Sequence, residues 1–261
     1  MTIYGRYEIV RTLTPEEEEL AAKQEELARL QAKLSDRELA LASLKAELAA
    51  FEGLYLRRVG VLYAELDEWS ARLAELRAEH DGTAEARTEA AEARSQARES
   101  YSAAHGEAAK VLPFRPSQDL RSLYHDAARR VHPDMATDEN DRTRRERLMT
   151  EVNAAYAAGD KDAIRRILAD LEISPDTVQG SDIGAALVRV LRQLRQVRNR
   201  IAAIDLEIAN LSNTDMAKLK AKVEQAAAEG RDLLAEMATS VQARVNAVKH
   251  EVEAVSSEAC R

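Results

Sequence analysis

The most distinctive short motif in this chain is the tripeptide His132-Pro133-Asp134. The imidazole can donate or accept a hydrogen bond, and the carboxylate can accept a charge-assisted hydrogen bond from a guanidinium group. Proline fixes its own φ angle, so it would hold the loop between the two polar side chains rigid. The chemistry that these residues offer is therefore recognition through directed hydrogen bonds.

Two helices are expected to hold this tripeptide at the corner where they meet. Residues 117–131 carry an apolar stripe at helical spacing, made of Leu120, Leu123, Tyr124, Ala127 and Val131. Proline disfavours helix at the residue before it, so the helix should end at His132. After a loop over 135–141, a second helix would place Met149, Val152 and Tyr156 on one side. The sequence thus predicts two antiparallel helices joined by an exposed loop.

This arrangement resembles the J-domain of the DnaJ family. There, a helix with an aliphatic-aromatic pair leads into His-Pro-Asp, and the next helix carries a Phe-x-x-Ile-Asn-x-x-Tyr pattern. Here that pattern reads Met149-Thr150-Glu151-Val152-Asn153-Ala154-Ala155-Tyr156. The residues at matching offsets from the tripeptide are Leu120, Tyr124, Ala128, Asn153 and Tyr156. The resemblance covers about a sixth of the chain, over residues 117–158.

The resemblance implies a co-chaperone that docks on a DnaK-type heat-shock chaperone and stimulates its ATPase. It implies a docking surface made of His132, Pro133, Asp134, Arg121, Arg129, Arg130 and Tyr124. It also implies a packing set made of Leu120, Val131, Val152, Asn153 and Tyr156. No bond is broken by such a protein, so we expect no enzymatic activity, no catalytic residue and no cofactor.

The sequence also departs from the family pattern. The usual Tyr-Arg-Lys of the first of these two helices is Tyr124-His125-Asp126 here, and Asp126 opposes the remaining arginines. The family's preceding helix is missing, and the segment containing Val111, Leu112 and Phe114 is a candidate replacement. These departures leave a second hypothesis open, a structural coiled-coil scaffold whose degenerate J-like module serves only in assembly.

The composition predicts an all-α fold with long coiled coils. Charged residues make up 32% of the 261 residues and aromatic residues only 4%, with 9 Gly and 5 Pro. A net charge of −8 argues against nucleic-acid binding, and no apolar run is long enough for a membrane span. Cys260 is the one cysteine, which excludes an internal disulfide or a cysteine zinc site and fits a cytoplasmic location. A metal site at His125 and His132 is disfavoured against a surface histidine beside a motif histidine.

The N-terminal arm carries a heptad seam of Leu20, Leu27, Leu34, Leu41 and Leu48. The pattern then shifts by one residue and continues through Val59, Leu62, Leu66, Trp69, Leu73 and Leu76, which indicates a stutter or a bend near Gly53 and Gly60. After a turn at 81–83, an alanine-rich helix to about 110 is expected to fold back on 59–80.

The C-terminal arm carries a seam from Leu187 to Leu211, a turn at 212–215, and a final helix from Met216 to Val255 with one phase slip. Because the turn is short, we expect the two helices to be antiparallel neighbours. Arginines between Arg189 and Arg200 are more typical of coiled-coil flanks paired with acids such as those at 16–19 than of a nucleic-acid site.

These patterns divide the chain into an N-terminal strap (1–14), an N-terminal coiled-coil hairpin (15–112), a J-domain-like module (113–172) and a C-terminal antiparallel helical hairpin (173–261). The expected fold is all-α, with the module between two coiled-coil arms. The arms would bind a client or a partner protein. Whether their seams pair within one chain or make a homodimer is left open by the sequence.

Overall fold

The computed structural model describes residues 14–136, 139–172 and 183–259, and every regular element among them is helical. The predicted all-α fold is therefore confirmed. Residues 1–13 of the predicted strap (1–14), the segment 173–182 and Cys260 lie outside the described residues. Among the helices that are described, none combines the length and apolarity needed to cross a membrane.

The chain forms two compact units that do not follow the predicted boundaries. Unit 1 combines residues 1–43 with 116–208, and unit 2 combines residues 44–115 with 209–261. Each unit therefore contains part of the N-terminal arm together with part of the C-terminal arm. The long helix α1, which spans Pro15–Tyr55, contributes to both.

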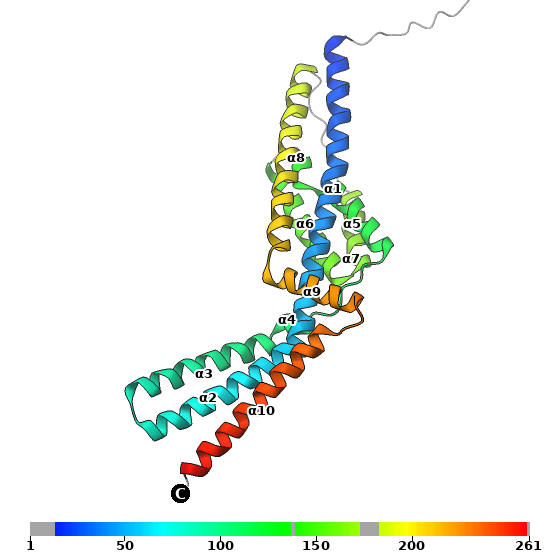
Figure 1. The fold of residues 1–261 in the computed structure, drawn as a ribbon. Helices are drawn as coiled ribbons and strands as arrows, with labels where there is room; N and C mark the ends of the chain where they lie inside the picture. Colours follow the sequence, from blue (N-terminus) through cyan, green and yellow to red (C-terminus); the bar gives the residue numbers. More distant parts are fainter. Residues whose placement is uncertain (1–13, 137–138, 173–182, 260–261) are drawn as a thin grey trace, which may run out of the picture. The chain divides into compact units, whose positions relative to one another are not determined.

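Unit 1 is built on α1 and α8 (Ile183–Ser212), which lie side by side and run in the same direction (Figure 1). Their apolar seams are buried at Leu27, Leu34, Leu41, Val190, Leu194, Val197, Ile201 and Ile204. Ion pairs flank the seams, with Arg37 bound to Asp205 at 3.1 Å and Arg198 bound to Glu26. Within this unit the two arms thus provide each other's apolar contacts.

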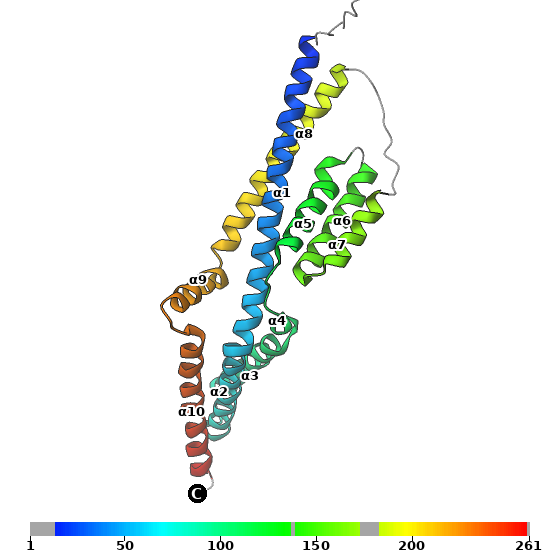
Figure 2. The same ribbon diagram turned by 90° about the vertical axis from the view of Figure 1, so that its right-hand side faces the viewer.

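Three further helices complete unit 1 on one side of α1 (Figure 2). They are α5 (Gln118–Val131), α6 (Glu139–Ala158) and α7 (Lys161–Glu172), and a short 3-10 turn, η2 (Pro133–Met135), follows α5. We call α5, η2, α6 and α7 the module.

Local signals fix the ends of the module helices. The Ser117 side chain accepts a hydrogen bond from the Leu120 amide at 3.2 Å, which caps the start of α5. Gly159, with φ of 73°, ends α6, and the Asp160 side chain then accepts a hydrogen bond from the Ala163 amide at the start of α7. The three helices can therefore pack closely with short connections.

Unit 2 contains a π-helical turn, η1 (Leu56–Gly60), which joins α1 to α2 (Val61–Asp81). A π turn holds one more residue than an α-helical turn, so it absorbs the predicted one-residue shift of the seam without ending the helix. Val59 on this turn is fully buried in a cluster with Phe51, Leu66, Leu234, Val241 and Val245. The extra residue in the seam is thus held in the π turn, and α1 and α2 can both contribute to this cluster.

The alanine-rich helix α3 (Ala84–His105) folds back on α2, as expected. Gly82, with φ of 66°, and the N-cap Thr83 make the turn between them. Ala90, Ala97 and Ala104 are buried along this contact, because small side chains let the two helices approach closely. Arg94 of α3 binds both Glu68 and Glu75 of α2 at 2.7 Å.

The segment that contains Val111, Leu112 and Phe114 is not helical. After the short helix α4 (Glu107–Lys110), the Val111 carbonyl accepts a hydrogen bond from the Arg57 side chain at 2.7 Å. A Cβ atom on Gly53 would come within 2.8 Å of that carbonyl, so only glycine allows this approach. Leu112 is 77% exposed. The expectation that this segment replaces the missing first helix is wrong, because it forms no helix and Val111 is bonded to Arg57 of η1.

The predicted antiparallel C-terminal hairpin is replaced by two separate pairings. While α8 lies along α1 in unit 1, α10 (Leu233–Ala259) lies along α2 in unit 2 and runs in the same direction (Figure 1). Arg77 of α2 binds Glu251 of α10 at 3.1 Å. The phase slip in the final seam is a break after α9 (Asp215–Ala228), where Gly230 adopts φ of 80°.

Candidate functional site

The tripeptide lies at the corner between α5 and α6, as the sequence predicted, and we call His132–Met135 the corner. α5 ends at Val131, and His132 has an extended backbone, with φ of −60° and ψ of 132°. Pro133 then starts the 3-10 turn. The corner is not exposed as a whole, since His132 is only 4% exposed while Pro133 and Asp134 are half-buried.

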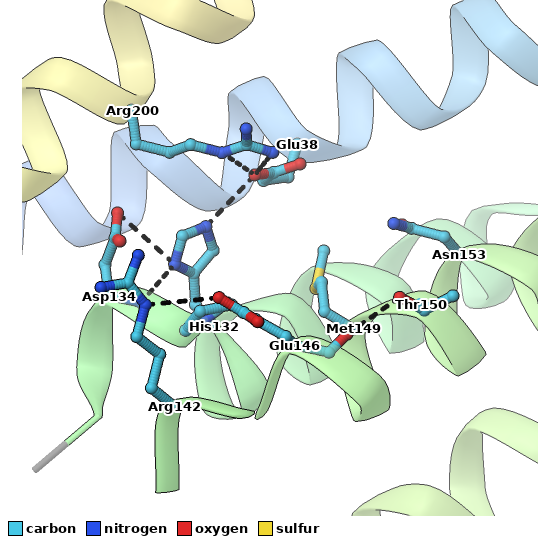
Figure 3. Close-up of a pocket in the computed structure, with 10 residues that line it drawn as sticks. Glu38, His132, Asp134, Arg142, Glu146, Met149, Thr150, Asn153 and Arg200 are labelled. Carbon is cyan, nitrogen blue, oxygen red and sulfur yellow. Dashed lines mark hydrogen bonds and ion pairs between the residues drawn. The ribbon is translucent and has the colours of Figure 1, made fainter. Parts of the chain in front are cut away.

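Both ring nitrogens of His132 have partners (Figure 3). Nδ1 accepts a hydrogen bond from the Asp134 amide at 3.1 Å, and Nε2 lies 3.2 Å from the Glu38 carboxylate of α1. Because a nitrogen that accepts a bond carries no hydrogen, the ring hydrogen belongs on Nε2, which donates to Glu38. The imidazole thus stiffens its own turn with one nitrogen and binds α1 with the other.

Glu38 is a buried carboxylate that is held from two sides. It is 3% exposed, and Arg200 of α8 binds the same oxygen as His132, with its Nη2 at 2.8 Å. Burial acts to raise the pKa of Glu38, but the hydrogen bond from His132 and the charge of Arg200 outweigh it, so the pKa lies below the ordinary glutamate value. The carboxylate is therefore ionised in the folded protein at neutral pH.

This lowered pKa predicts a specific loss of stability in acid. A carboxylate with a depressed folded-state pKa contributes stability above its unfolded pKa, and the contribution disappears as the pH falls through the folded value. We expect the unfolding midpoint of the wild type to fall toward that of Glu38→Gln below about pH 4.5, while a constant difference persists from pH 5 to 7. Thermal unfolding followed by circular dichroism across this range measures the difference.

The matched control for this experiment is Glu25→Gln, which removes an exposed carboxylate from the same helix. The unfolding midpoint of Glu25→Gln should differ little from that of the wild type at every pH tested, because exposed ion pairs contribute little to stability. Parallel pH profiles for wild type and Glu38→Gln would contradict an ionised Glu38 that stabilises the fold.

Asp134 faces a cavity of about 340 Å³ next to the corner. Its lining includes Glu38, Arg142, Glu146 and Arg200. The Oδ2 atom of Asp134 is buried and accepts no hydrogen bond, although His132 Nδ1 lies 3.7 Å away. A buried carboxylate oxygen without a donor is unusual, and it leaves an acceptor that an incoming donor could satisfy.

The predicted arginines of α5 divide between different sides of the helix. Arg121, Arg129 and Arg130 are all exposed, but Arg121 and Arg130 are nine residues apart, which places them about half a turn apart around the axis. Arg129 and Arg130 line a second cleft, of about 500 Å³, together with Arg145 of α6. Asp126 lines the same cleft and pairs with Arg130 at 3.2 Å, so it offsets part of the positive charge.

The predicted packing residues lie between α5, α6 and α1. Leu120, Val131, Val152 and Tyr156 are buried, whereas Asn153 is exposed. Tyr124, predicted as a docking residue, is fully buried and donates a hydrogen bond to Asn153 at 2.7 Å. It therefore serves packing in this structure. Tyr156 reaches α1, where its hydroxyl lies 2.8 Å from that of Ser43.

The two histidines that suggested a metal site bind different acids of α1. His125 lies 3.1 Å from Asp36, whereas His132 lies beside Glu38. Across the described ranges, no three His, Cys, Asp or Glu side chains gather in a way that could hold a metal ion.

Sequence reasoning missed Glu38 and Arg200. One signal was available: Leu30, Leu44 and Phe51 form a second apolar row beside the leucine heptads, and Arg37 interrupts it. In the structure Arg37 turns outward to Asp205, and Glu38 turns inward to the corner. A charged pair within an otherwise apolar seam marks the place where the module meets the arm.

Comparison with known proteins adds no relative. No protein-family model, no curated protein and no solved structure matches this chain.

Proposed function

We propose that this chain is a J-domain co-chaperone that docks on a DnaK-type chaperone and stimulates its ATPase. The observation that supports this proposal is that motif residues on α5 contact motif residues on α6. Tyr124 of α5 bonds to Asn153 of α6, and its ring lies 4.6 Å from the ring of Tyr156. Residues from both halves of the motif thus join the two helices whose corner is His-Pro-Asp. The protein would act in the cytoplasm, and by binding alone.

Asp134 supplies the docking chemistry of the corner. Its Oδ2 atom is buried beside the cavity without a hydrogen-bond donor, so it suits an arginine of the chaperone that enters there when the turn moves. Arg129 and Arg130 line the adjoining cleft and would meet acidic groups of the same partner. Arg121 points elsewhere, so we expect it to contribute less.

The helical arms would select the client. In unit 1, α8 exposes apolar side chains at Val188, Leu191 and Leu206. Exposed apolar residues suit a protein partner better than nucleic acid, even where arginines follow them, as Arg189 and Arg192 do here. A second copy of the chain is one such partner.

One observation favours the second candidate, a structural scaffold in which the J-like module serves assembly. His132 is buried and bonded to Glu38, so the most characteristic side chain of the motif is used inside the protein. In a scaffold this contact would only fasten the module to α1.

An ATPase assay separates the two candidates. A co-chaperone should raise the turnover of a DnaK-type chaperone, and Asp134→Asn should return it to the rate of the chaperone alone, because the amide loses the charge that would bind an arginine. Asp119→Asn is the control, since Asp119 is a 79% exposed carboxylate on the same module, far along α5 from the corner. If neither the wild type nor variants of Glu38 change the ATPase turnover of the chaperone, the scaffold function is favoured.

A further inference from the structure

We propose that Glu38 and Arg200 form a latch that holds the corner closed and limits access of the chaperone to it. We call the contacts among Glu38, His132 and Arg200 the corner latch. The inference rests on the proposed function, because it concerns the regulation of the same site. Glu38 and Arg200, which lie outside the motif, would then determine what fraction of the time the motif is accessible to the chaperone.

The first argument is geometric. The latch residues come from three separate elements, with Glu38 on α1, His132 after α5, and Arg200 on α8. A single oxygen, Glu38 Oε1, accepts hydrogen bonds from Nε2 of His132 at 3.2 Å and from Nη2 of Arg200 at 2.8 Å (Figure 3). Removing one carboxylate would therefore release the imidazole and the guanidinium together.

The second argument concerns what the latch covers. His132 must expose Nε2 if that atom is to meet a partner, but Glu38 occupies it. Asp134 is tied to the same turn, because its amide bonds to Nδ1 of His132. A chaperone that engages the corner would have to displace Glu38 or wait until the turn moves.

The third argument concerns the cost of opening. Opening breaks the hydrogen bond between His132 and Glu38, while the ion pair between Glu38 and Arg200 remains, so no buried charge loses its partner. The corner itself is a short 3-10 turn, whereas Tyr124 and Tyr156 anchor the rest of the module on α1 through their own hydrogen bonds, to the Glu38 carbonyl and to Ser43. The turn can thus move away from Glu38 while the module stays attached.

The latch should lower the apparent affinity of the corner for the chaperone. If the corner is competent to bind only part of the time, its apparent affinity is reduced by that fraction. A corner that is open about one tenth of the time would bind about tenfold more weakly than a permanently open one. Glu38→Ala should therefore lower the concentration needed for half-maximal ATPase stimulation by several fold.

The test uses the full chain and two readouts. The first is the reactivity of His132 toward diethyl pyrocarbonate, located by mass spectrometry, with the exposed His80 as an internal reference. The second is the half-maximal concentration for stimulation of a DnaK-type chaperone. We expect His132 to be protected in the wild type and reactive in Glu38→Ala, with a parallel gain in stimulation. Glu38→Gln and Arg200→Ala provide milder variants in case Glu38→Ala does not fold.

The matched control is Asp205→Ala. It breaks the neighbouring ion pair with Arg37 between the same two helices, without touching the corner, so neither readout should change. Equal His132 reactivity in wild type and Glu38→Ala would overturn the latch. If wild type and Glu38→Ala both stimulate the chaperone with the same half-maximal concentration, the latch is overturned as well. If no variant stimulates while His132 becomes reactive in Glu38→Ala, the proposed function fails and the contact is a structural lock.

Discussion

Replacement of Tyr124 by alanine is expected to lower the free energy of unfolding by about 3–5 kcal/mol, the range typical of a large aromatic residue deleted from a core. Tyr124 is fully buried, and its ring packs on that of Tyr156 at 4.6 Å. Its hydroxyl donates toward the Asn153 side chain and the Glu38 carbonyl. The substitution therefore removes contacts with α6 and α1 together, and urea unfolding followed by circular dichroism measures the loss.

The matched variant is Tyr124→Phe, which keeps the ring and removes the hydroxyl. We expect it to cost about 1–2 kcal/mol, because Asn153 is exposed and can bond to water. Burial raises the pKa of Tyr124, so the hydroxyl keeps its hydrogen and remains a donor at neutral pH. Equal losses for the two variants would show that the hydrogen bonds, and not the ring packing, hold α5 in place.

Much of the fold could be predicted because it depends on local patterns. Leu27, Leu34 and Leu41 are buried as their heptad spacing indicates, and Gly82 and Thr83 end one helix and start the next. These features depend on residues within a few turns of each other. The all-α class and the fold-back of α3 on α2 follow from them.

Helix pairing could not be predicted in the same way. A short turn such as Asn213-Thr214 allows α8 to fold back on the next helix, but it does not require this. The seam of α8 instead meets α1, where Arg37 faces Asp205 across the contact. A seam of Leu, Ile and Val carries little information about its partner, so the choice is made by charges and by the other helices of the unit.

The site was predictable only in part for the same reason. The motif located the corner and the helices on either side. Its accessibility depends on Glu38, nearly a hundred residues earlier in the chain, and on Arg200, well after the corner. Whether Tyr124 faces a partner or a core depends equally on α1, which covers it here. A resemblance confined to residues 117–158 contains none of these distant elements.

The hydrogen bond between His132 and Glu38 is what distinguishes the two proposed functions. In a scaffold it would be permanent, and its removal would only destabilise unit 1. In a regulated co-chaperone its removal would destabilise the protein somewhat and also increase activity. A gain of function from a destabilising change has no explanation in a scaffold, so the sign of the effect of Glu38→Ala decides between them.

Deletion of Glu65 from the regular part of α2 is expected to destabilise unit 2 by more than about 3 kcal/mol. Loss of one residue from a regular α-helix rotates the residues after it by about 100° relative to those before it. Leu66 and the residues after it could then no longer share a core with Val59 and Phe51, and each buried aliphatic side chain contributes about 1.5–3 kcal/mol. Trp69, the single tryptophan, lies on α2, so its fluorescence during urea unfolding reports this unit directly.

The control is deletion of Arg58, which removes the extra residue of the π-helical turn, so the turn can become regular α-helix without rotating α2. Arg58 forms an exposed ion pair with Asp232 at 2.7 Å, so loss of its side chain should cost less than about 1 kcal/mol. A large loss of stability for the Glu65 deletion beside a small loss for the Arg58 deletion would show that the π turn absorbs one residue and keeps the core in register. If the two deletions lower the urea midpoint equally, the π turn is not what aligns Val59 with Phe51.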